Sequence, residues 1–153
     1  MTVRRTLSRE RAVTVAGLVV GAAGIALLWA SGVEFPVAIP PGLVILLVGA
    51  LFVGLTPWRW ATGVGAFMGL FVTCGFLISG GIPNLFGADG DTFFGTPNPV
   101  DRDTLGTIVG TWVQTIGALT ALIAGVIATR NNYRSRPPGL GDESRAVVKA
   151  QYR

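Results

Sequence analysis

The sequence predicts an all-α integral membrane protein, a four-helix bundle with both termini inside and one outer loop. The first reason is composition, since half of the 153 residues are apolar, only 13% are charged and the mean hydropathy is +0.59. An ordinary soluble domain of this length carries more charge. The second is four uncharged apolar segments, each close to the roughly 20 residues that cross a hydrocarbon core about 30 Å thick. These predicted spans are 12–30, 37–55, 61–79 and 105–128.

The spans divide the chain into three parts. A basic cytoplasmic segment, 1–11, precedes a membrane domain over 12–129, and a basic tail follows over 130–153. Because the tail is polar and broken by Pro137-Pro138-Gly139, we expect it to be disordered and cytoplasmic. The outer loop, of about 20 residues, lies between the third and fourth spans and takes up most of the segment 87–106.

Charged residues beside the spans predict the orientation. Positive charge concentrates on cytoplasmic flanks of multi-pass proteins. Three flanks carry arginine, namely the two chain ends, with several each, and the short turn after the second span, with one; these residues are Arg4, Arg5, Arg9, Arg11, Arg59, Arg130, Arg134 and Arg136. The outer loop instead holds four of the eight acidic residues and only Arg102. We therefore expect a multi-pass protein of the plasma (cytoplasmic) membrane with both termini in the cytoplasm.

The fourth span carries the most regular pattern. Small residues and one amide recur at intervals of three, four or eight and so fall on one helical stripe; they are Gly106, Gly110, Gln114, Gly117 and Gly125, with Thr107 and Thr111 beside them. Small residues let another helix approach closely, and a glutamine can form a hydrogen bond across the contact. The stripe is thus a helix-packing face within the bundle or a face for a partner. A third interpretation is the lining of a polar pore.

The outer loop offers two further candidates. Phe93 and Phe94 are adjacent aromatics outside the spans, which favours insertion into the membrane interface or contact with a partner. The carboxylates Asp89, Asp91, Asp101 and Asp103 are expected to be solvated rim charges. A weak calcium site built from both pairs is the alternative, although neither pair has the ligand spacing or closing glutamate of an EF-hand.

Reactive groups are scarce, and this limits the function classes. The chain has no histidine, one cysteine, Cys74, and no charged residue inside any span, whereas ion-coupled transport normally uses charged residues within the membrane. We therefore expect no enzyme, no cofactor and no bound metal. The sequence favours a non-catalytic accessory or scaffolding subunit of a larger membrane assembly. The alternative is a small channel or uniporter for a neutral or weakly polar solute, lined by Thr107, Thr111 and Gln114.

The expected partners follow from the same features. Arg130, Arg134 and Arg136 are predicted to bind anionic lipid headgroups on the cytoplasmic side. Another membrane protein or a second copy of this chain is expected on the glycine stripe of the fourth span or on the similar pairs Gly17 with Gly21 and Gly65 with Gly69. Nucleic acid is not expected, because the positive charges gather at the chain ends rather than alternating with exposed aromatics.

Overall fold

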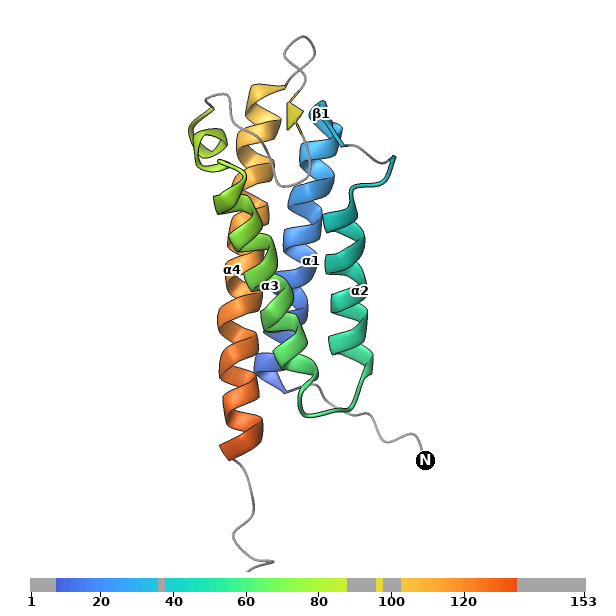
Figure 1. Cartoon of the computed structure of the whole chain (residues 1–153). Helices are drawn as coiled ribbons and strands as arrows, with labels where there is room; N and C mark the ends of the chain where they lie inside the picture. Colours follow the sequence, from blue (N-terminus) through green and yellow to red (C-terminus); the bar gives the residue numbers. More distant parts are fainter. Residues whose placement is uncertain (1–7, 36–37, 88–95, 98–102, 135–153) are drawn as a thin grey trace, which may run out of the picture.

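The computed structural model describes residues 8–35, 38–87, 96–97 and 103–134. It contains four packed helices, which confirms the predicted all-α class (Figure 1). Helix α1 covers Arg9–Ala30, α2 Pro41–Leu55, α3 Ala61–Ile78 and α4 Thr104–Arg134. A short 3₁₀ helix, η1, covers Ile82–Phe86. Two short strands, β1 (Val33–Glu34) and β2 (Thr96–Pro97), pair antiparallel, with Val33 opposite Pro97 and Glu34 opposite Thr96.

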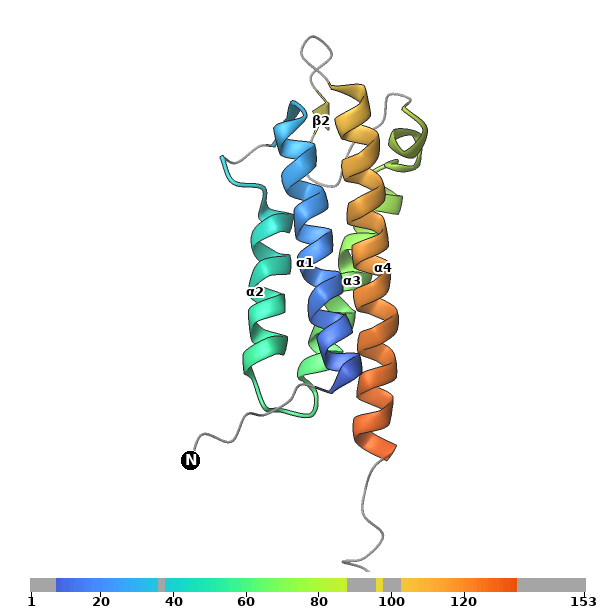
Figure 2. The same cartoon turned by 180° about the vertical axis from the view of Figure 1, so that it is seen from behind.

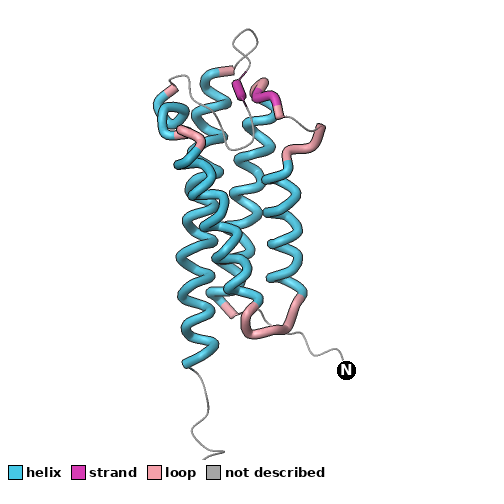
Figure 3. Tube along the Cα trace, in the orientation of Figure 1, coloured by secondary structure: helices cyan, strands magenta, loops and turns pink. Residues whose placement is uncertain are grey.

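Consecutive helices run antiparallel, and α4 returns beside α1 to close the bundle. Helix α1 packs against α2 and α4, and α3 packs against the same two helices from the other side (Figures 1 and 2). The beginning of α1, the α2–α3 turn and the end of α4 lie at one end. The short strands and η1 lie at the opposite end (Figure 3). We call the first the arginine end, because it carries Arg9, Arg11, Arg59, Arg130 and Arg134.

Three of the helices are long and apolar enough to cross a membrane: α1, α3 and α4. The second predicted span, 37–55, is shorter than expected. Residues 38–40 are not helical, and α2 has 15 residues from Pro41 to Leu55. At roughly 1.5 Å per residue it is about 22 Å long, less than the hydrocarbon thickness of about 30 Å. The prediction of a helix from residue 37 is therefore wrong at its start.

Proline explains where α2 begins. Pro40 and Pro41 have no backbone N–H, and proline is favoured at the start of a helix because the first N–H groups lack intrahelical acceptors. The carbonyl of Pro40 accepts from the N–H of Leu43 at 3.1 Å and from that of Val44 at 3.4 Å. The helix therefore starts with few unsatisfied donors, which matters in an apolar environment where water cannot replace them.

The ends of α1 and α4 also differ from the predicted spans. Helix α1 begins at Arg9, one turn before residue 12, and the side chain of Ser8 accepts a hydrogen bond from the N–H of Arg11 at 3.4 Å. Helix α4 continues to Arg134, six residues beyond the predicted span. Arg130 and Arg134 fall within the predicted tail, 130–153, but belong to a helix. The rest of the predicted tail lies outside the described residues.

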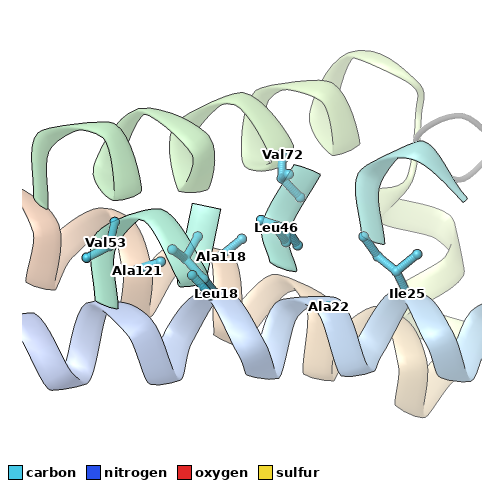
Figure 4. Packing of buried hydrophobic residues seen from close by; sticks show 9 residues of the cluster. Leu18, Ala22, Ile25, Leu46, Val53, Val72, Ala118 and Ala121 are labelled. Carbon is cyan, nitrogen blue, oxygen red and sulfur yellow. The ribbon is translucent and has the colours of Figure 1, made fainter. Parts of the chain in front are cut away.

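The core is small and lies where the four helices meet. Buried side chains from all of them pack together (Figure 4); they include Leu18, Ala22 and Ile25 of α1, Leu46 and Val53 of α2, Val72 of α3, and Ala118 and Ala121 of α4. Many large apolar side chains remain on the outside. On α2 alone these are Val44, Leu47, Val48, Leu51 and Leu55. Such an exterior fits hydrocarbon rather than water, because exposed apolar surface of this extent is unusual in soluble monomers.

Candidate functional site

The glycine stripe of α4 lies mainly inside the bundle, against α1. A β-carbon added at Gly17 of α1 would lie 2.6 Å from the backbone nitrogen of Ala121 on α4. One added at Gly117 would lie 2.7 Å from the α-carbon of Gly21. Real β-carbons do not approach backbone this closely, so the two helices meet through their backbones. Glycine is required here by the close approach rather than by its conformational freedom.

The stripe continues from one neighbouring helix to the other. At Gly110 an added β-carbon would lie 3.1 Å from the carbonyl oxygen of Gly24 on α1, whereas at Gly125 it would lie 2.7 Å from that of Thr62 on α3. A β-carbon added at Gly106 would collide with the side chain of Ser31, the residue that follows α1. These described neighbours of the glycines therefore belong to α1, α3 and the residue that follows α1, all within the bundle.

A hydrogen bond between two threonines accompanies the α3–α4 contact. The hydroxyl oxygens of Thr62 and Thr129 are 3.0 Å apart, and the Thr129 hydroxyl lies 2.7 Å from the carbonyl oxygen of Gly125. Because Thr129 donates its one hydrogen to Gly125, Thr62 must be the donor to Thr129. This bond joins two helices across the bundle.

The residues predicted to line a pore are enclosed by the protein. Thr107, Thr111 and Gln114 are 0%, 1% and 3% exposed. The hydroxyl of Thr107 donates to the carbonyl of Asp103 at 2.9 Å, and that of Thr111 to the carbonyl of Thr107 at 2.7 Å. These hydroxyls are already paired within α4, and this packing gives the channel alternative no support.

An arginine that sequence reasoning treated only as a flanking charge joins α1 to α2. The Nε of Arg11 donates to the carbonyl of Val53 at 2.7 Å, and its Nη2 donates to the carbonyls of Gly54, at 3.4 Å, and Thr56. The last carbonyls of a helix have no intrahelical donors, and a cation there also meets the negative end of the helix dipole. A sequence signal did exist, because the last turn of α2 contains no basic residue of its own.

A second arginine holds the α2–α3 turn against α4. The Nη2 of Arg59 donates to the carbonyl of Asn132, and the side-chain amide of Asn132 donates back to the carbonyl of Arg59 at 3.2 Å. The flanking residues Trp58 and Trp60 stack, with ring centroids 5.1 Å apart and planes 23° apart. Phe52 contacts both indoles. The turn is therefore an ordered part of the bundle.

The remaining candidate side chains are either exposed or outside the described residues. Arg130 and Arg134 are exposed near the end of α4. Arg136, Phe93, Phe94, Asp89, Asp91 and Asp101 lie outside the described residues. Asp103 immediately precedes α4, where its N–H donates to the carbonyl of Ser31 at 3.1 Å and its carbonyl accepts from the N–H of Thr107 at 2.9 Å. Asp103 thus joins the end of α1 to the start of α4.

Near the same end, η1 is attached to α4. The indole N–H of Trp112 donates to the carbonyl of Leu85 at 3.1 Å. Asn84, within η1, is fully buried. In the described part of the chain, no group of three or more His, Cys, Asp or Glu side chains is placed to hold a metal ion.

Comparisons with protein-family models, curated proteins and solved structures find no match for this chain.

Proposed function

We propose that the chain is a small non-catalytic subunit that supports a larger assembly in the plasma membrane, with both termini in the cytoplasm. The observation that carries this proposal is the backbone-to-backbone contact of α1 with α4 at Gly17, Gly21 and Gly117. In this contact the glycine stripe of α4, with its threonines and Gln114, faces the inside of the bundle. The outer surface of the bundle is then apolar along the helices and charged at the arginine end, which suits a protein that contacts lipid and other helices.

The proposed orientation rests on charge. Five described arginines occupy the arginine end, whereas the described residues of the opposite end include the carboxylates of Glu34 and Asp103. The positive-inside rule places the arginine end in the cytoplasm. Trp58 and Trp60 place this end at an interface between hydrocarbon and water, which tryptophan prefers on either side of a membrane.

A pull-down in mild detergent tests the proposal. Full-length protein, tagged at the C-terminus, should recover a defined membrane partner in a fixed ratio. A matched variant, Phe93→Ala with Phe94→Ala, asks whether the outer-loop aromatics contribute, and we expect it to recover less partner at equal abundance. A second variant, with all four outer aspartates changed to Asn, should recover as much partner as the original chain. Recovery of the chain alone, together with solute flux in liposomes, would favour the channel alternative instead.

A further inference from the structure

We propose that the arginine end of the folded bundle is a docking surface for anionic phospholipid headgroups, contacted by Arg9, Arg130 and Arg134. The inference rests on the proposed membrane placement but not on the accessory role. It differs from binding by a flexible tail, because all three side chains belong to α1 or α4. The geometry also separates these arginines from the two that hold the fold together.

Charge complementarity identifies the partner. The described residues of this end include five arginines and a single carboxylate, that of Glu10. A cluster with so little internal neutralisation attracts anions, and the phosphate groups of a membrane lie at the level where tryptophans settle. Anionic lipids of the cytoplasmic leaflet supply this negative charge, and each nearby arginine gains roughly 1 kcal/mol from it.

Hydrogen bonding divides the arginines into two groups. The guanidinium groups of Arg11 and Arg59 donate to backbone carbonyls of the protein. Arg9, Arg130 and Arg134 are exposed, and within the described ranges their guanidinium groups have no protein partner. Because Arg130 and Arg134 are four residues apart on one helix, their side chains share a face. These two can therefore reach the same headgroup region.

The stacked tryptophans fix the depth of this surface. Trp58 is 55% exposed and Trp60 is 46% exposed, although their rings stack on each other and meet Phe52. The reciprocal bonds between Arg59 and Asn132 hold the turn that carries them against the last turn of α4. Indole rings seated in the interface would thus hold Arg130 and Arg134 at headgroup level, because turn and helix end move as one unit.

The test uses the full chain in nanodiscs of phosphatidylcholine with increasing amounts of phosphatidylglycerol. Native mass spectrometry of the released protein measures how strongly bound phosphatidylglycerol exceeds bound phosphatidylcholine. One variant changes Arg9, Arg130 and Arg134 to Gln, and its matched control changes the same residues to Lys. We expect the Gln variant to lose selectivity by about fivefold per residue, on the order of a hundredfold in all. The Lys control should keep most of the selectivity for phosphatidylglycerol. Salt should reduce this selectivity in both the original chain and the Lys control.

Two results would overturn the inference: equal binding of the two lipids by the original chain, or unchanged selectivity in the Gln variant. Melting in pure phosphatidylcholine checks folding, and we expect little change because these exposed side chains form no hydrogen bond or ion pair with a described protein group. Should the triple variant unfold, the single variants Arg130→Gln and Arg134→Gln replace it. Each is expected to lose about fivefold in selectivity for phosphatidylglycerol. The measurement needs no partner protein, so its failure leaves the accessory role standing, and a failed pull-down leaves the lipid surface standing.

Discussion

The Nε of Arg11 lies 2.7 Å from the carbonyl oxygen of Val53 and joins the first turn of α1 to the last turn of α2. Together with the bonds to Gly54 and Thr56, it supplies donors to the carbonyls that end α2. Helix α2 is the shortest of the four and has no basic residue in its last turn. Its end therefore depends on a side chain more than 40 residues earlier in the chain.

Replacing Arg11 by Ala should destabilise the bundle at the arginine end. A hydrogen bond to a charged group contributes about 1.5–3 kcal/mol, so we expect the free energy of unfolding to fall by roughly 2 kcal/mol. The free energy of unfolding of Arg11→Lys should lie between those of the original chain and Arg11→Ala, because an ammonium lacks the planar fork that reaches several carbonyls. Reversible unfolding in mixed micelles measures the effect. Arg9→Ala is the matched control, since Arg9 is exposed, and an equal loss in both variants would contradict this role for Arg11.

Gly117→Ala should separate α1 from α4. The added β-carbon would lie 2.7 Å from the α-carbon of Gly21 and 2.8 Å from the carbonyl oxygen of Gly17. Backbone atoms cannot turn aside as a flexible side chain can, so the loss should be about 2 kcal/mol or more despite the better helix propensity of alanine. Gly54→Ala is the control, because its nearest neighbour would be 3.9 Å away, at Val15. A thermal melt in detergent in which both variants match the original chain would show that this contact is looser than described.

The hydroxyls of Thr62 and Thr129 should be energetically coupled. A double-mutant cycle with Thr62→Val and Thr129→Val isolates their shared term. We expect about 0.6 kcal/mol, the typical size of an interhelical hydrogen bond in a membrane protein. A second cycle with Thr62→Val and Thr111→Val is the control, since the Thr111 hydroxyl donates within its own helix. A coupling no larger than that of the control pair would mean that the 3.0 Å contact adds nothing to stability.

Cysteine labelling should show both ends of the chain inside the cell and the outer loop outside. Single cysteines at Ser8, Asp91 and Ser144, in a chain with Cys74→Ala, report the three positions. The Cys74 change is needed because this side chain is exposed. A membrane-impermeant reagent applied to intact cells should label position 91 only, and all three after the membrane is opened. Labelling at 8 or 144 with protection at 91 would reverse the proposed orientation.

The sequence by itself determined the fold class and most of the helix positions. Hydropathy is a local property, so an uncharged apolar segment such as 61–79 predicts a helix wherever its neighbours lie. The actual helix, Ala61–Ile78, agrees within one residue. The same reasoning overestimated the length of the second helix. Residues 38–40 belong to the same apolar segment as the helix that follows, but Pro40 and Pro41 set the start of α2.

The tertiary structure decided which side of each helix meets another helix. Periodicity placed Gly110, Gly117 and Gly125 on one stripe, but a stripe looks the same whether it meets α1, α3 or a different protein. Only the packing shows that Gly117 meets the backbone of Gly21 and that Gly125 meets α3. The sequence shows that the last turn of α2 has no basic residue of its own. That Arg11 is the donor depends on the distance between two helix ends after the bundle closes. Local patterns limit which surfaces exist, whereas pairing depends on the relative placement of distant segments.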